Sequence, residues 1–231
     1  MKKSVLSFVI MSMLFAYAAK AQDCVYYFPT TEGASVETSS YDAKGTLTGT
    51  SVQRVVKKEV SGDQTTITIA SDTYLANGTK NGNTTFQYYC KAGVFYLDMK
   101  KILDPALINQ YKDKGINIKA TDCAIPGTLT VGEALPETSV TMEISDEGVP
   151  MMAFKIKIYN RKVEAVETVK TNMGDYQCYK VAYDVETNMG MIIKTKGAEW
   201  YAKNVGTVKT EYYDAKGKLM SYTLMTKFKD Q

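Results

Sequence analysis

From residue 22 onward, apolar and polar side chains alternate with a period of two. The clearest run has Met152, Phe154, Ile156 and Ile158 alternating with Lys155, Lys157 and Tyr159. Such alternation places one face of a strand on a core and the other in water. Short turn sequences such as Lys91-Ala92-Gly93 separate these segments. The pattern predicts a mainly β protein with antiparallel strands.

The segment from Met99 to Lys114 departs from this pattern. Its apolar residues recur at spacings of three and four, Pro105 suits the first turn of a helix, and Gly115 suits its end. We expect one short helix of about two turns from Pro105, preceded by a further turn over residues 99–103. Its apolar stripe should pack on the concave face of a curved sheet, as a plug rather than a mobile lid.

The first 21 residues have the features of a secretory signal peptide. Lys2 and Lys3 precede an apolar stretch over residues 5–18, and Ala19-Lys20-Ala21 has the small-x-small form of a cleavage site. The segment before Cys24 does not fit the pattern of a lipid-anchored precursor. We therefore predict a signal peptide over residues 1–21, a single mainly-β domain over residues 22–231, and a periplasmic or secreted protein. The mature chain has no apolar run that would span a membrane.

Four cysteines, Cys24, Cys90, Cys123 and Cys178, would be exported into an oxidising compartment. Disulfides are expected there, and four cysteines allow three pairings. A bridge at Cys24 would hold the N-terminal strand, and a bridge between Cys90 and Cys123 would brace the helix. The absence of a CxxC motif argues against a redox or zinc role.

The chain has no histidine, which excludes Ser-His-Asp and Cys-His catalysis and histidine-ligated zinc. Glu164 and Glu167 have odd spacing on one predicted strand, so we expect them on opposite faces. No other carboxylate pair, phosphate-binding loop or nucleophile motif stands out. We predict no catalytic, metal or cofactor-binding residues, no cofactor, and a protein that is not an enzyme.

The net charge argues against nucleic acid as a partner. The formal charge is +3, but the first 21 residues contribute three lysines and no acid. The remaining basic and acidic residues balance. A neutral chain has no general electrostatic attraction to DNA, RNA or anionic lipid.

One sequence pattern occurs twice. Residues 41–47 and 213–219 share the form Tyr-Asp-Ala-Lys-Gly-x-Leu, which is typical of a strand, a turn with glycine at positive φ, and a returning strand. An old duplication, the pairing of two equivalent hairpins, and convergence on favourable turn chemistry all explain it.

Tyrosine and methionine are the residues most suggestive of a binding surface. Seventeen tyrosines exceed seven phenylalanines, and the mature chain has nine methionines. Both side chains suit ligand pockets and interfaces. Tyrosines on half-exposed sheet faces and methionines in a core are the favoured explanation, and the single Trp200 is expected to anchor the core.

Three segments carry a family resemblance: Asp23 to Pro29, Tyr176 to Val181, and Gly197 to Glu211 with its Trp-Tyr-Ala and Val-Gly-x-Val-Lys elements. With Ile158 to Glu164, they resemble the TapB-like family of exported β proteins from Bacteroidota. The resemblance implies a strongly curved antiparallel sheet, as in a half-barrel or open barrel. It brings no established activity and no site residues.

Two functions follow as hypotheses. The first is a non-enzymatic envelope protein that holds an apolar or amphipathic, lipid-like ligand in the curved sheet. The second is an interaction or assembly module that binds another envelope protein through sheet edges or tyrosine-rich faces.

Overall fold

The computed structural model describes residues 25–103 and 105–230 and contains thirteen antiparallel strands in one sheet. The elements are β1 (Ser35–Asp42), β2 (Leu47–Ser61), β3 (Gln64–Leu75), β4 (Lys80–Lys91), β5 (Val94–Leu97), the 3-10 helix η1 (Met99–Ile102), α1 (Pro105–Gln110), β6 (Gly115–Thr121), β7 (Cys123–Pro126), β8 (Thr138–Asp146), β9 (Val149–Thr171), β10 (Gly174–Asn188), β11 (Ile192–Ala202), β12 (Gly206–Asp214) and β13 (Leu219–Lys229). The expected mainly-β class, with one short helix, is confirmed.

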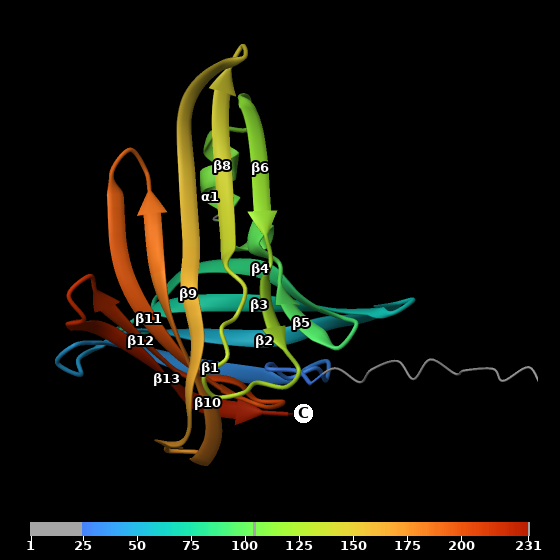
Figure 1. Ribbon diagram of the computed structural model, residues 1–231, viewed down its shortest axis with the longest axis vertical. Helices are drawn as coiled ribbons and strands as arrows, with labels where there is room; N and C mark the ends of the chain where they lie inside the picture. Colours follow the sequence, from blue (N-terminus) through green and yellow to red (C-terminus); the bar gives the residue numbers. More distant parts are fainter. Residues whose placement is uncertain (1–24, 104, 231) are drawn as a thin grey trace, which may run out of the picture.

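The sheet curls into a nearly closed barrel with one seam. Its strand order is β6-β8-β9-β10-β11-β12-β13-β1-β2-β3-β4-β5-β7. The two edge strands, β6 and β7, are consecutive in the chain and separated only by Asp122. Figure 1 shows β6, β8 and β9 running across the direction of β2, β3 and β4. The strongly curved, open-barrel architecture is thus confirmed.

The first and last strands meet in the middle of the sheet order. Ser35 of β1 is the register partner of Lys229 of β13, and Asp42 is the partner of Ser221. The first and the last strand of the chain therefore lie side by side. The seam is formed by the middle of the sequence, not by its ends.

The repeated sequence pattern forms two hairpin turns of the same design. In the β1–β2 turn, Asp42 Oδ1 accepts hydrogen bonds from the backbone N–H groups of Lys44 and Thr46, both at 2.8 Å. In the β12–β13 turn, Asp214 makes the equivalent bonds, both at 2.9 Å. The backbone N–H donors hold the pKa of both carboxyls below the ordinary value.

The two hairpins are also neighbours, because β13 pairs with β1. Their turns lie at the same end of the sheet, and Tyr41 stacks on Tyr222 with ring centroids 5.0 Å apart. Gly45 and Gly217 have φ values of 85° and 84°, as the sequence predicted. Of the three explanations, the pairing of equivalent hairpins describes the arrangement in the sheet.

One expected turn is absent. The sequence suggested that Asn160-Arg161 would end one strand and start another, but β9 runs unbroken through both residues. Its pairing with β10 shifts register between Ala182 and Asp184, and Asn160 has a φ of 51°. Asn160 therefore forms a β-bulge within one strand and not a turn between two strands. It bends β9 and directs the Arg161 side chain into the interior.

The helical segment packs on the inner face of β6, β8 and β9, as expected. The cluster contains Met99, Leu103, Leu107, Ile108 and Tyr111 from the segment, packed around Val140, Met142 and Ile144 of β8. Asp98 caps η1 by accepting a hydrogen bond from the backbone N–H of Lys100. These side chains cover the inner face of this part of the sheet.

The central core lies where the two groups of strands cross. Its buried members are Tyr27, Phe28, Ala34, Val55, Ile67, Ile69, Phe95, Ile125, Leu129, Leu135, Val163, Val181 and Tyr201. Leu129 and Leu135 come from the segment that follows β7. That segment is tied to β9, because Gly132 N–H donates to Val163 O at 2.8 Å and Leu135 N–H donates to Arg161 O at 2.8 Å.

Tyr27 places an unsatisfied polar group in this core. Its hydroxyl is buried with no hydrogen-bond partner among the described residues, and burial raises its pKa above the ordinary value. We expect Tyr27→Phe to raise the free energy of unfolding by about 1 kcal/mol, because it removes an unsatisfied buried group. Urea denaturation measures the change.

For a second tyrosine variant, Tyr201→Phe, we expect the opposite change in the free energy of unfolding. The Tyr201 hydroxyl donates to the Glu199 carboxylate, so Tyr201→Phe should lower the free energy of unfolding by roughly 1.5–3 kcal/mol. Equal losses in Tyr27→Phe and Tyr201→Phe would show that the Tyr27 hydroxyl has a partner in solution.

The expected bridge between Cys90 and Cys123 is not formed. Cys123 and Cys178 are both buried free thiols. Cys123 belongs to the cluster under the helical segment, and Cys178 packs with Trp200 and Val208. The two thiols therefore belong to different clusters of the core. The predicted bridge at Cys24, like the signal peptide, falls outside the described residues.

Candidate functional site

The inner face of the curved sheet contains a hollow of about 250 Å³. It lies among β1, β2, β4, β12 and β13, the β11–β12 turn and the N-terminal segment. Its lining residues are Phe28, Val36, Thr38, Ser40, Ser51, Gln53, Tyr88, Val205, Gly206, Thr207, Thr210, Tyr212 and Thr223. None of them is charged, although 23% of the chain is Asp, Glu, Lys or Arg.

Strand register creates one wall of the hollow. Thr210 of β12 pairs with Thr223 of β13, and Thr223 pairs with Ser40 of β1. Ser40 in turn pairs with Gly49 of β2, so small residues form a row across four strands. Register partners point to the same face of a sheet. Small side chains do not fill the concave side, and the hollow results.

The hydroxyl groups of this wall are available to a ligand. Within the described chain, no hydrogen bond joins the side chains of Thr38, Ser40, Thr210 and Thr223 to another protein group. Their oxygens are also not among the buried polar atoms without a partner, a group that, among the described residues, contains only the Tyr27 hydroxyl. These oxygens therefore face solvent inside the hollow.

Aromatic rings form the opposite wall. Phe28 stacks on Tyr88 with centroids 4.9 Å apart, and Tyr88 stacks on Phe95 at 4.9 Å. The β11–β12 turn closes this side: Asn204 N–H donates to Tyr26 O at 2.8 Å, and Gly206, with φ of 119°, lies against Phe28. The hollow thus has one hydroxyl-rich side and one aromatic side.

A carboxylate lies at the end of the hydroxyl row. Glu199 of β11 is the register partner of Thr210. Its two oxygens accept hydrogen bonds from the hydroxyls of Tyr183, at 3.0 Å, and Tyr201. Burial raises the pKa of Glu199, while the Tyr183 hydrogen bond and the charge of Arg161 oppose that rise. The carboxylate is therefore held by its protein neighbours.

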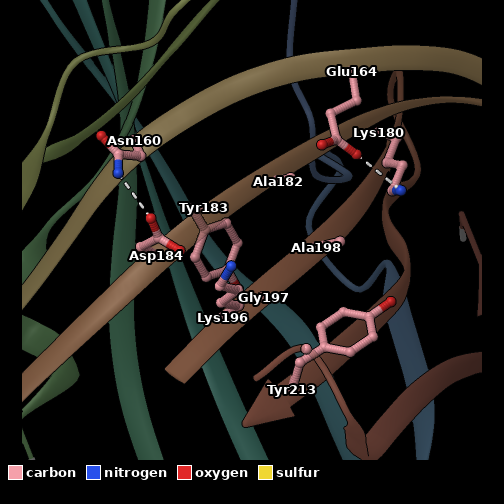
Figure 2. A pocket seen from close by; sticks show the side chains of 11 residues that line it. Asn160, Glu164, Lys180, Ala182, Tyr183, Asp184, Lys196, Gly197, Ala198 and Tyr213 are labelled. Carbon is pink, nitrogen blue, oxygen red and sulfur yellow. Dashed lines mark hydrogen bonds and ion pairs between the residues drawn. The ribbon is translucent and has the colours of Figure 1, made fainter. Parts of the chain in front are cut away.

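Figure 2 shows a second pocket, of about 340 Å³, lined mainly by residues from the other face of strands β9 to β12. Ala182 and Ala198 are register partners and form its floor. Glu164 pairs with Lys180 at 2.9 Å, and Asn160 Nδ2 donates to Asp184 at 2.8 Å. These polar groups satisfy one another, which favours a structural role over ligand binding.

The prediction that Glu164 and Glu167 lie on opposite faces of a strand is wrong. Glu167 accepts a hydrogen bond from Trp200 Nε1, and Glu164 pairs with Lys180, whose Nζ lies 5.4 Å from the centre of the Trp200 ring. Both carboxylates therefore reach the same cluster. A register shift between Lys180 and Val181 breaks the alternation on which the prediction rested. Trp200 itself is buried and anchors the core, as expected.

Two hairpin tips expose apolar side chains. The β8–β9 tip exposes Val149, Met151 and Met152, and the β10–β11 tip exposes Met189, Met191, Ile192 and Ile193. Both hairpins point toward the same end of the molecule (Figure 1). Asn188 at the end of β10 pairs with Lys155 of β9, six residues from Val149, so the β8–β9 hairpin extends beyond the β10–β11 tip. Adjacent residues on a strand face opposite sides, so both sides of each tip are apolar.

Of the two residue types that the sequence analysis singled out, tyrosine lines the hollow, at Tyr88 and Tyr212, and methionine does not. Met99, Met142 and Met225 fill the core, whereas Met151, Met152, Met189 and Met191 lie at the tips. The serine and threonine row carried no signal by itself, because it exists only through the pairing of β12, β13, β1 and β2. The two equivalent hairpins were the one clue to that pairing.

The two free thiols are expected to be unreactive in the folded protein. Burial raises the pKa of both Cys123 and Cys178 to about 11. At pH 8, Ellman's reagent should react with neither thiol in the native state and with both after unfolding in guanidinium. Cys178→Ser should remove one equivalent from the unfolded count. Rapid reaction of the native protein would contradict the burial of these residues.

Among residues 25–103 and 105–230, no group of three or more Cys, Asp or Glu side chains is arranged to hold a metal ion. In the same ranges, no helix is long and apolar enough to cross a membrane.

Comparison with known proteins gives relatives of the same fold. A "putative exported protein with YmcC-like fold" from Bacteroides fragilis is 23% identical with a TM-score of 0.71, covering 89% of this chain and 100% of that chain. A "putative lipoprotein" from Parabacteroides distasonis is 28% identical with a TM-score of 0.73, covering 90% of this chain and 100% of that chain. A comparison with curated proteins gave no match. The model of the DUF3108-like family matches residues 31–225. This chain therefore belongs to the DUF3108-like family.

Proposed function

We propose that this protein is an exported, non-enzymatic protein of the cell envelope that holds an amphipathic ligand in the hollow of its sheet. The observation that supports this most is the contrast between the walls of the hollow, one of hydroxyls and one of aromatic rings. A purely apolar ligand would strip water from the hydroxyls without replacing their hydrogen bonds. An amphipathic ligand therefore fits the hollow better than a purely apolar one.

Export is proposed on three grounds. The predicted signal peptide covers residues 1–21, and one structural neighbour is described as exported and the other as a lipoprotein. The narrower likeness to the TapB-like family of Bacteroidota points the same way. It rests on the segments Asp23 to Pro29, Ile158 to Glu164, Tyr176 to Val181 and Gly197 to Glu211.

Native mass spectrometry of protein purified from its own cell envelope tests the ligand. We expect a stoichiometric extra mass that organic extraction releases. Thr223→Phe, which fills the hollow, should lose this mass. Thr195→Phe, on β11 but outside the hollow, should keep it. A bare polypeptide mass for the unaltered protein would contradict ligand binding.

The apolar hairpin tips support a second candidate function, the interaction or assembly module. A group of exposed apolar side chains often marks a protein–protein contact, and each tip carries such a group. Exchanging Met191 and Ile193 for serine should then abolish co-purification of an envelope partner without changing the unfolding midpoint. Retention of the partner by this variant would contradict a role for the tips.

A further inference from the structure

The chemistry of the hollow narrows the class of ligand. We propose, resting on the function proposed above, that the hollow takes a neutral, hydroxyl-rich ring, such as a sugar, with its apolar face on the aromatic wall and its hydroxyls on the threonine and serine row. The acyl part of an amphipathic ligand would then extend out of the hollow.

Charge is the first argument. No lining residue carries a charge, so neither an anionic nor a cationic head group finds a counter-ion there. Moving an unpaired ion into such a site is unfavourable. Glu199, at the end of the row, is not a free partner for a cation, because both oxygens accept tyrosine hydroxyls and Arg161 lies close enough to stabilise its charge.

Hydrogen bonding is the second argument. Hydroxyl groups both donate and accept, so a surface of Thr38, Ser40, Thr210 and Thr223 matches a ligand whose hydroxyls also do both. Ser51 is already engaged with Ser71 at 3.2 Å, which fixes its position at the edge of the row. A site that hydrogen-bonds ligand hydroxyls discriminates strongly against analogues that lack them.

Shape is the third argument. The hollow measures about 250 Å³, slightly below the roughly 300–1,000 Å³ of pockets that bury drug-sized ligands. It suits one ring and not a folded acyl chain. Phe28 is 4% exposed and Tyr88 stacks between Phe28 and Phe95, so the aromatic wall offers a ligand ring the small apolar area that lines the hollow and not an open ring face.

Two amphiphiles with the same alkyl chain provide the test: octyl β-glucoside, with a neutral sugar head, and octyl sulfate, with an anionic head. Both are titrated below their micelle-forming concentrations against the folded protein, and binding is followed by NMR chemical shifts. We expect octyl β-glucoside to bind at least tenfold more tightly, and methyl β-glucoside to compete with it. Shifts should centre on β12, β13 and β1.

Isosteric variants test the hydroxyl row. Thr210→Val and Thr223→Val each remove one hydroxyl while keeping the shape, and each should weaken octyl β-glucoside binding at least fivefold. Thr195→Val is the matched control, because Thr195 is half-buried on β11 and lies outside the hollow. If Thr210→Val or Thr223→Val has a lower urea midpoint than the unaltered protein, Ser40→Ala is measured in its place.

The outcomes separate the two proposals. Equal binding of both amphiphiles, with shifts in the hollow, would leave amphipathic binding intact and overturn the sugar assignment. Unchanged affinity in Thr210→Val and Thr223→Val would also overturn it. An envelope-derived ligand that lacks a sugar would do the same. If neither amphiphile binds and the envelope protein carries no extra mass, both proposals fail.

Discussion

Replacing Phe95 by alanine is expected to lower the free energy of unfolding by about 3–5 kcal/mol. Phe95 is 1% exposed and lies at the crossing of the two groups of strands. Its ring stacks on Tyr88 at 4.9 Å and meets Tyr26 edge-on at 6.2 Å. Alanine would leave a cavity between β4, β5 and β7, and it would remove the support of the aromatic wall. Urea denaturation followed by tryptophan fluorescence measures the loss.

Two controls make this result specific. Phe95→Leu keeps most of the volume and should cost less than half as much as Phe95→Ala. Val60→Ala, at a side chain that is 70% exposed, should change the free energy of unfolding by no more than about 0.5 kcal/mol. A loss below about 1 kcal/mol in Phe95→Ala would mean that this site collapses freely and is not a packed core.

Arg161→Met is expected to cost about 2–4 kcal/mol, because two carbonyl groups lose a charged donor. Arg161 is 3% exposed, and its Nη1 donates to Ala124 O at 3.0 Å and to Pro136 O at 2.7 Å. These bonds tie β9 to seam strand β7 and to the segment after it. Methionine keeps the apolar stem but offers no donor.

The loss of unfolding free energy in Arg161→Met should also depend on pH. The charge of Arg161 lowers the pKa of Glu199, so it stabilises the ionised carboxylate. Removing that charge should therefore cost more above the pKa of Glu199 than below it. Arg161→Lys, which keeps a charge but has a single ammonium group, should recover the pH dependence better than the stability. A pH-independent loss in Arg161→Met would mean that the two charges do not interact.

The elements with strong local patterns were predictable. Alternation identified the strands, Pro105 and the apolar spacing identified the helix, and the Asp-x-x-Gly turns were read correctly at both copies. These features depend on residues that are close in the sequence. The curvature of the sheet was reached by resemblance and not by pattern.

The features that the sequence did not reveal depend on strand pairing. A bulge at Asn160 converts a turn signal into a continuous strand, and a second register shift brings Glu164 and Glu167 to one cluster. Neither shift has a local signature. The hollow depends on which of thirteen strands are neighbours, so its lining could be assembled only after β12, β13, β1 and β2 were placed side by side.

The pairing of β1 with β13 has a consequence for the order of folding. The partners Ser35 and Lys229 are separated by almost the whole chain, so this contact closes the longest loop in the molecule and carries a high entropic cost. Such non-local pairing slows folding. Synthesis proceeds from the N-terminus, so β1 emerges first and keeps one edge open until the last strand follows. An open edge can pair with other chains, so the interval between those two events is when this protein is most vulnerable to aggregation.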